Sequence, residues 1–254
     1  MEFLNLCLNI IKTNYLSILL GIRTTLFLSI LGTLFGFIIG LFVGGIRAIK
    51  LDFNAKNYKK RIKKILDGIG RIYIDVFRGT PMMIQALFFY YSLRKILNWT
   101  PIIAALVVLS VNTGAYMAEI IRSGINSIDK GQTEAARSCG LSNIQTMLYI
   151  IFPQAIYNAF ASIGNELIVN IKDSSVLMVL SVTELMFETK SIAGSNYRLV
   201  ETYFITAMIY LLLTGIASII LNIIENKISH SKTSLPQSAT NFANLKLARG
   251  ERHE

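Results

Sequence analysis

Histidine and cysteine are scarce in this chain of 254 residues, and neither type forms a cluster. The two histidines, His230 and His253, are close to the C-terminus, and the two cysteines, Cys7 and Cys139, are far apart. Metal sites need several His, Cys or carboxylate ligands, and a Ser-His-acid set needs a histidine within the folded body. We therefore expect no metal centre, no bound cofactor, no catalytic set of this type and no disulfide framework.

A glycine-rich nucleotide loop is also missing, because the pattern G-x-x-x-x-G-K-[ST] does not occur. That pattern is the one whose backbone amides and lysine hold nucleotide phosphates. The chain is therefore not expected to bind ATP or to be an enzyme. If ATP drives its activity, hydrolysis is expected on a partner chain.

Apolar residues are abundant and the charge is strongly positive. Hydrophobic residues make up 53% of the chain and the formal net charge is +10. Several apolar runs approach the roughly 20 residues that span a bilayer. A basic soluble protein would suggest nucleic acid, but here the basic residues flank apolar runs, as in membrane proteins. The composition predicts an all-α integral membrane protein in contact with lipid, and no nucleic-acid partner.

The apolar runs predict five membrane spans within a membrane domain over residues 21–228. Residues 1–20 are apolar but interrupted by asparagines and Lys12, which favours a helix lying in the membrane interface. The first span carries glycines at four-residue intervals, a spacing that permits close helix packing in lipid, and Pro81 is expected to kink the second. The predicted spans are Leu26–Ile46, Ile72–Leu97, Ile102–Ile121, Pro153–Ile171 and Tyr203–Ile224.

Charge sets the expected orientation of these spans. The segment Arg47–Arg71 is the most basic part of the chain, so the positive-inside rule makes it cytoplasmic and puts the N-terminus outside. The apolar run Val176–Leu185 is too short to cross and is expected to fold back as a re-entrant or interfacial segment. Five crossings then leave the polar tail, residues 229–254, in the cytoplasm, where its composition predicts disorder.

A polar cytoplasmic loop of about residues 125–153 interrupts the second half of the chain. Its sequence predicts a short helix around Glu134, Ala135 and Ala136, a left-handed turn at Gly140, and a second helix that ends before Pro153. Two alanines beside a glutamate make a thin surface that a partner backbone can approach. The alternative from composition alone is an ordinary amphipathic connection.

Two spans carry polar stripes at helical spacing. Asn112, Tyr116, Glu119 and Ser123 share one face of the third span, and Asn158, Ser162, Asn165, Glu166 and Asn170 recur similarly in the fourth. Polar groups in a membrane are costly, so the stripes indicate either a water-accessible path or bonds between helices. Glu119 could simply pair with Arg122, one turn on. The candidate pathway residues are Asn112, Tyr116, Glu119, Asn165, Glu166, Lys172 and Asp173.

Several motifs resemble those of one transporter family. Glu134-Ala135-Ala136, followed by Gly140, Ile150 and Pro153, resembles the EAA loop of ABC-importer permeases. Phe152 and Cys139 are mild departures from that pattern. Further matches, which together resemble the polar amino-acid branch and cover roughly Gly21 to Asn222, are Phe77–Pro81 with Gln85, Ala115-Tyr116 with Ala118-Glu119 and Arg122, and Lys172–Ser175.

The resemblance implies a permease subunit of an ATP-driven importer that moves polar amino acids across the cytoplasmic membrane by alternating access. It further implies an ABC ATPase docked on Glu134, Ala135, Ala136 and Gly140, a second permease chain and an extracytoplasmic solute-binding protein. The alternative is a self-contained secondary transporter or channel, which should show an internal repeat; none is evident. A structural membrane subunit of an enzyme complex is a third interpretation.

Overall fold

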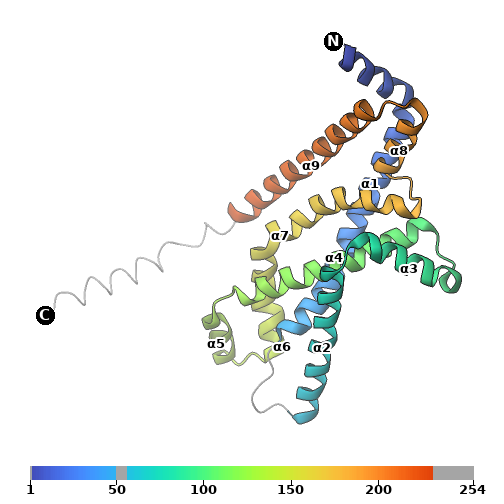
Figure 1. Cartoon of the computed structure of the whole chain (residues 1–254). Helices are drawn as coiled ribbons and strands as arrows, with labels where there is room; N and C mark the ends of the chain where they lie inside the picture. Colours follow the sequence, from blue (N-terminus) through green and yellow to red (C-terminus); the bar gives the residue numbers. More distant parts are fainter. Residues whose placement is uncertain (1, 50–55, 231–254) are drawn as a thin grey trace, which may run out of the picture.

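The computed structural model describes residues 2–49 and 56–230, and these parts contain helices and no strand (Figure 1). The predicted all-α membrane fold is therefore confirmed. The elements in order are α1 (Glu2–Ala48), α2 (Asn57–Gly79), α3 (Met82–Leu97), α4 (Pro101–Asn126), α5 (Lys130–Ser138), α6 (Asn143–Thr146), the π-helix η1 (Met147–Ile151), α7 (Phe152–Asp173), the 3₁₀-helix η2 (Ser174–Leu180), α8 (Leu185–Asn196) and α9 (Leu199–His230).

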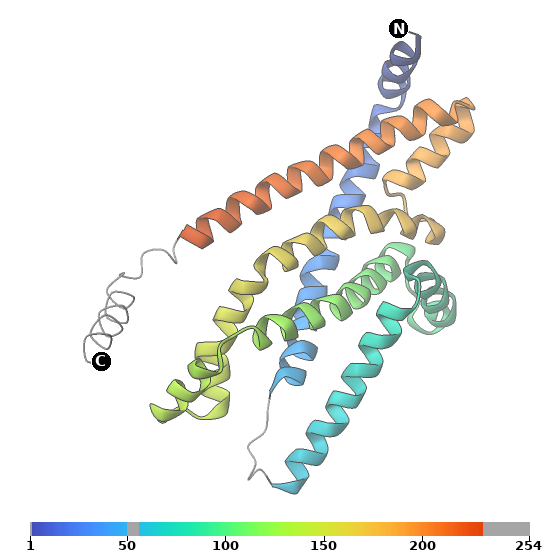
Figure 2. The same ribbon diagram turned by 60° about the vertical axis from the view of Figure 1, so that its left-hand side comes forward.

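The helices give the molecule two distinct ends. The N-terminus, α8 and the start of α9 lie at one end, and α5, α6 and the start of α2 lie at the other (Figures 1 and 2). The long helix α1 runs between the two ends. Residues 231–254 of the predicted polar tail lie outside the described residues, so the disorder of the tail stays a prediction.

Helix α1 continues through the boundary expected after residue 20. Its backbone departs from helical geometry at Asn14 (φ −118°, ψ 19°), where the side chain amide donates to the Ile10 carbonyl at 3.0 Å. The polar residues near the start therefore bend the helix and do not end it. An interfacial position for residues 1–20 stays a prediction.

A glycine stripe on α1, made of Gly32, Gly36, Gly40 and Gly44, packs directly against α4. A methyl group added at Gly36 would lie 2.7 Å from Thr113 Cβ, and one added at Gly44 would lie 2.5 Å from the Ala118 carbonyl oxygen. These distances leave no room for a side chain. The predicted role of the glycine spacing in close helix packing is thus confirmed, and α4 is the partner.

Asn170 joins three helices beside the glycine stripe. Its side-chain amide donates to Thr33 Oγ1 on α1 at 2.8 Å, and its side-chain oxygen accepts from Thr113 Oγ1 on α4 at 3.0 Å. The Ser29 hydroxyl on α1 also donates to the Asn170 backbone carbonyl at 3.1 Å. The asparagine is buried, so these bonds satisfy a polar group that would otherwise be costly in the membrane.

The stretch expected to form the second span is two helices. α2 ends at Gly79 and α3 begins at Met82, so the kink expected at Pro81 is a complete break. The Gln85 side-chain amide spans the break and donates to the Phe77 and Thr80 carbonyls, both at 2.9 Å. A side chain thus bonds to backbone carbonyls that the break at the proline leaves without helical partners.

Four helical segments of the described chain are long and apolar enough to cross a membrane: α1, α4, the segment from Asn143 to Leu180, and α9. A span needs about 20 apolar residues, but α3 has only 16 residues and α2 is rich in charge. A fifth crossing would have to use α2 and α3 together. The five-span count stays a prediction for that reason.

The short apolar run that follows α7 folds back into the protein. It forms η2, turns at Ser181 with a left-handed backbone (φ 61°), and leads into α8, which the sequence did not predict. Glu184 caps α8 by accepting from the backbone amides of Met186 and Phe187 at 2.8 and 2.7 Å, and Tyr210 of α9 donates to it at 3.1 Å. These bonds hold the buried carboxylate between α8 and α9.

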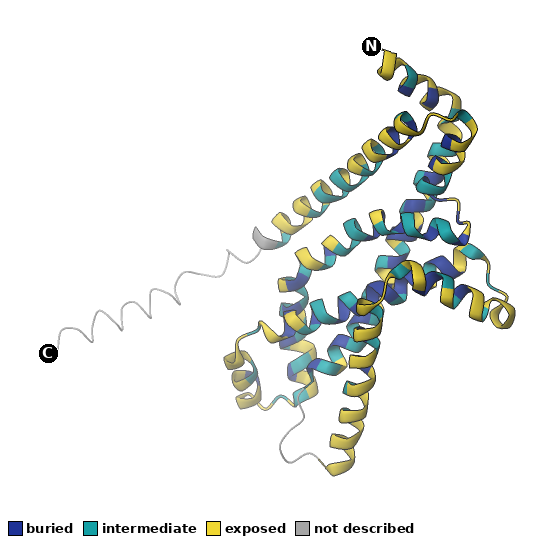
Figure 3. Ribbon diagram, viewed as in Figure 1, coloured by how far each residue is buried: buried dark blue, intermediate teal, exposed yellow. Residues whose placement is uncertain are grey.

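Large apolar side chains remain exposed along α1 and α9, and Figure 3 shows many exposed positions on both helices. Buried residues gather instead where α4 meets α1, α3 and η2, in a core that contains Leu28, Ala105, Leu109 and Leu177. An apolar exterior is the surface that a lipid environment favours.

We expect Gly44→Ala to destabilise the protein while Gly45→Ala does not. The two glycines are neighbours, but only Gly44 faces α4; a methyl group at Gly45 would have nothing within 4 Å. Overpacking of this kind costs about 1–3 kcal/mol. Thermal unfolding of the purified chain in one detergent would measure both variants. Equal melting temperatures would show that the stripe does not hold α1 against α4.

Thiol labelling in intact cells tests the orientation and span count. Cys7 is buried against Ile10, Ile192 and Ile205, so it should contribute little signal, whereas Cys139 is exposed. With five spans, a membrane-impermeant reagent should reach Cys139 only after permeabilisation. In a Cys139→Ser chain, Tyr197→Cys, at an 88% exposed position between α8 and α9, should react from outside. Labelling of Cys139 without permeabilisation would mean either that the orientation is reversed or that α2 and α3 do not cross.

Candidate functional site: the loop of α5 and α6 and the polar cavity

The first helix of the polar loop is delimited by side-chain and backbone caps. The Asp129 carboxylate accepts from the Gly131 amide at 2.7 Å and starts α5. At the other end Gly140 has φ +83°, its amide donates to the Arg137 carbonyl at 2.9 Å, and the Leu141 amide donates to the Ala136 carbonyl at 3.2 Å. This pair of bonds is a Schellman motif. The predicted left-handed turn at Gly140 is confirmed.

The second helix is continuous with α7. Ser142 and Gln145 form a capping box: the Ser142 amide donates to Gln145 Oε1 at 2.9 Å, and the Gln145 amide donates to Ser142 Oγ at 3.3 Å. α6 then passes through the π-helical turn η1 into α7.

The expectation that the second loop helix ends before Pro153 was therefore wrong. The Phe152 amide donates to the Met147 carbonyl, five residues back, so the wider turn carries the chain past the proline. Proline has no amide hydrogen to give to the preceding turn. No loop therefore separates α6 from α7.

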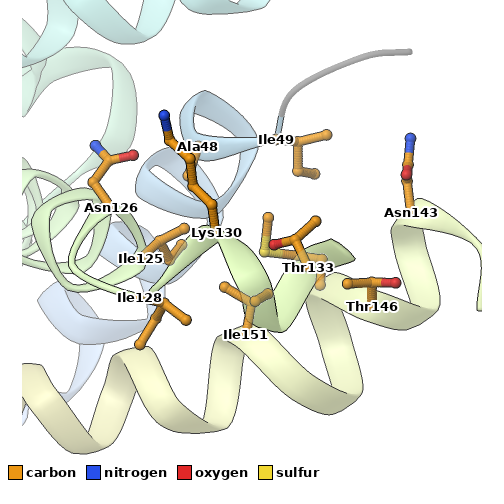
Figure 4. Close-up of a pocket in the computed structure, with 11 residues that line it drawn as sticks. Ala48, Ile49, Ile125, Asn126, Ile128, Lys130, Thr133, Asn143, Thr146 and Ile151 are labelled. Carbon is orange, nitrogen blue, oxygen red and sulfur yellow. The ribbon is translucent and has the colours of Figure 1, made fainter. Parts of the chain in front are cut away.

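The loop encloses a small cavity against the body of the protein (Figure 4). Its volume is about 160 Å³, and its walls come from the ends of α1 and α4, from α5 and α6, and from η1. Thr146 is buried in this wall, and among the described residues its hydroxyl has no hydrogen-bond partner. The loop thus packs on the body around this cavity.

The three residues predicted to form a thin surface do not share one environment. Glu134 and Ala135 are exposed on α5, but Ala136 is only 7% exposed and turns inward toward the loop itself. The open surface for a partner therefore contains Glu134 and Ala135, and Ala136 packs within the loop. Each residue of a helix is rotated by about 100° from the one before it, so Ala136 faces a different direction from Ala135.

A polar cavity of about 480 Å³ lies where α4 and α7 meet the end of α2. Its walls include Ser123 of α4, Ser127 directly after α4, and Asn158 and Ser162 of α7. Two of the three charged residues on its wall, Glu119 and Arg122, come from α4, and the third, Arg78, comes from α2. Part of each predicted polar stripe, Glu119 and Ser123 on α4 and Asn158 and Ser162 on α7, thus lines one cavity.

Arginines surround Glu119 at the cavity edge. The predicted pair with Arg122 is confirmed, with Arg122 Nη2 2.7 Å from Glu119 Oε2, and Arg47 at the end of α1 donates to the other carboxylate oxygen. Arg78 lies over the ring of Tyr116, 5.2 Å from its centroid, a distance typical of a cation–π contact. The arginines outnumber the carboxylate, so this edge carries a net positive charge.

The remaining candidate pathway residues are dispersed. Asn112 lies away from the cavity and donates to Gln85 Oε1 at 2.9 Å and to the Phe77 carbonyl at 3.2 Å, which ties α4 to the break between α2 and α3. Asn165 lines a separate pocket between α7 and α9. Glu166 is half-buried and interacts electrostatically with Arg78 and with Asp173. Lys172 is exposed near the end of α7.

Sequence reasoning did not identify Arg47 and Arg78 as members of the site. Arg47 appeared only as part of the basic segment, because 72 residues separate it from Glu119. Arg78 appeared only within a motif, and its contact with Tyr116 requires α2 to lie beside α4. Both pairs join residues that are far apart in the sequence, so no short-range spacing rule identifies them. The available signal was an arginine near the end of a predicted span.

Known proteins of one kind are similar to this chain. Residues 53–230 match the family model described as binding-protein-dependent transport system inner membrane component. The glutamine transport system permease protein GlnP of Escherichia coli strain K12 is 35% identical over 210 residues, covering 82% of this chain and 90% of the relative.

The probable amino-acid ABC transporter permease protein YckA of Bacillus subtilis strain 168 is 37% identical over 211 residues, covering 83% of this chain and 88% of the relative. A solved chain in the crystal structure of an amino acid ABC transporter with histidines superposes with a TM-score of 0.75 at 34% identity. That superposition covers 87% of this chain and 97% of the solved chain.

Proposed function

Because the chain belongs to the family of binding-protein-dependent transport system inner membrane components, we propose that it is the membrane-spanning subunit of an ATP-driven importer of polar amino acids. It works in the cytoplasmic membrane with an ABC ATPase, a second permease chain and an extracytoplasmic solute-binding protein. Its relatives include permeases named for glutamine and amino-acid transport, which supports the substrate class. The observation that carries the proposal is the capped, rigid loop of α5 and α6 joined directly to α7.

The loop has the properties that a coupling element requires. Asp129, the Schellman motif at Gly140 and the Ser142–Gln145 capping box fix the geometry of both helices. Its exposed face carries Glu134, whose carboxylate can accept charge-assisted hydrogen bonds from a partner arginine or backbone amide. A docked ATPase would therefore move α5 and α6 as one body.

In this proposal, α4 and α7 transmit motion of the loop to the polar cavity. α4 ends at Asn126, shortly before α5 begins, and η1 continues α6 into α7. The same two helices form the serine- and asparagine-lined walls of the polar cavity. When ATP draws two ATPases together, the docked loops would tilt α4 and α7 and open the cavity alternately to either side, as in alternating access.

The polar cavity is proposed as the cytoplasmic part of the translocation pathway. Tyr116, Glu119 and Glu166 remain candidate members, with Arg78 and Arg122 added by the structure. An amino acid carries a carboxylate and an ammonium group, and the wall offers both signs of charge. Asn112, Asn165, Lys172 and Asp173 also stay pathway candidates, although Asn112 bonds to Gln85 and Asn165 lines a separate pocket.

We expect Ala135→Phe and Gly140→Val to uncouple ATP hydrolysis from uptake. The phenyl ring would hold the ATPase away from an exposed face, and valine at φ +83° would be strained by roughly 1 kcal/mol or more and would re-aim α6. Ala135→Ser and Gly140→Asn are the matched controls, because serine is small and asparagine tolerates a left-handed backbone. Glu134→Ala should be milder.

ATPase binding to the purified chain and substrate uptake into vesicles would be measured for each variant. Normal binding and uptake by both bulky variants would remove the loop as the coupling element. Uptake that continues without ATP or an ATPase would favour the secondary transporter instead.

Ser162→Trp should block uptake while ATPase binding persists, and Ser162→Ala should transport normally. Ser162 is exposed on α7 and lines the polar cavity, so an indole there occupies the proposed path. Because the position is not buried in the core, the substitution should leave folding intact. Normal uptake by the tryptophan variant would mean that the polar stripes only bond helices to one another.

A further inference from the structure

The first half of α2 is an amphipathic helix that the rest of the chain leaves uncovered. Figure 3 shows α2 exposed over most of its length. A stripe of apolar side chains at helical spacing runs along one face, each about half exposed or more: Tyr58 (55%), Ile62 (53%), Ile65 (62%), Ile69 (60%), Ile72 (65%) and Val76 (49%). A stripe of this length has to be covered by lipid or by protein.

Contacts with the body use a different face of α2 and concentrate in its second half. Ile74 is buried, the Tyr73 hydroxyl donates to the Val111 carbonyl, and a methyl group at Gly70 would lie 3.0 Å from Arg47 Cδ. In the first half, Lys63 bonds to Asp67 and reaches the Arg47 carbonyl at 3.5 Å. The apolar stripe points away from these contacts.

Basic residues flank the start of the stripe. From Lys56 to Leu66 the chain carries Lys56, Lys59, Lys60, Arg61, Lys63 and Lys64 and no acidic residue. Lys59, Arg61 and Lys64 are all exposed. These residues lie at the end of the molecule that carries α5 and α6 (Figure 1), the end predicted to be cytoplasmic.

We propose that residues 56–66 of α2 lie in the cytoplasmic membrane interface and bind anionic lipid headgroups. The apolar stripe enters the acyl boundary, and the lysine and arginine side chains reach outward to the phosphates beside it. A basic helix with an opposed apolar face is the form that interfacial helices take. Each basic residue near an anionic surface strengthens attraction about fivefold, and the effect falls off within a Debye length.

The charge pattern selects lipid over protein as the occupant. The stripe of Ile62 and Ile65 continues without interruption into Ile69, Ile72 and Val76, toward the segment that the proposed fold places in the membrane. At a bilayer surface the anionic headgroups lie beside the apolar acyl region. In α2 the basic side chains likewise lie beside the apolar stripe. One lipid environment therefore covers the whole exposed face.

Tryptophan quenching in vesicles tests this assignment. The full chain with Trp99→Phe and Ile62→Trp would be reconstituted in phosphatidylcholine containing a small fraction of brominated lipid. Brominated phosphatidylglycerol should quench the tryptophan at position 62 at least threefold more effectively than brominated phosphatidylcholine. The matched control is Trp99→Phe with Ile219→Trp, at a 61% exposed position of α9 away from the basic cluster; it should be quenched equally by both lipids.

Neutralising the cluster should remove the preference. With Lys59→Gln, Arg61→Gln and Lys64→Gln added, or at 1 M salt, where the Debye length is about 3 Å, the two brominated lipids should quench equally. Ile69→Trp serves as a second reporter if the first variant folds poorly. Absence of quenching at both positions, or a preference that survives neutralisation, would overturn the proposal. Loss of quenching when the ATPase is added would instead make this face a protein docking surface.

Discussion

The close contact between α1 and α4 is the interaction on which the rest of the structure depends. In lipid, helices gain little from burying apolar surface against each other, so association relies on close packing and interhelical hydrogen bonds. The glycine stripe removes side chains from α1 where Leu109, Thr113 and Met117 of α4 occupy the space. Asn170 then bonds to both helices beside this contact and fixes α7 against them. Three spans are thereby held in one arrangement.

That arrangement also positions the end of the molecule that carries α5 and α6. α4 and α7 leave the packed core side by side, and each leads into the loop of α5 and α6, α7 without any break in the helix. The polar cavity lies between the same two helices. Under the proposed function, the surface that meets the ATPase and the walls that meet the substrate therefore belong to one mechanical unit. The small cavity behind the loop lies between that unit and the end of α1 (Figure 4).

Particular elements show where sequence reasoning succeeded and failed. The turn at Gly140, the Glu119–Arg122 pair and the glycine packing face of α1 were predicted correctly, since each depends on spacing within a few turns of one helix or on one backbone angle. The complete break at Gly79–Pro81, the continuous passage past Pro153 and helix α8 were not. In each of these, a side-chain bond or an unusual turn satisfied backbone groups that sequence patterns left without partners.

In the candidate site, too, some features were predictable from the sequence and others were not. By itself, the sequence determined an all-α membrane protein, the polar stripes, the two-helix loop and its family motifs, because apolar length, helical period and capping residues act over short distances along the chain. Only the tertiary structure decided that Asn112 bonds helices, that Asn165 faces α9, that Ala136 turns inward, and that Arg47 and Arg78 join the cavity edge. Those outcomes depend on which helix lies beside which, and that is set by packing between segments distant in sequence.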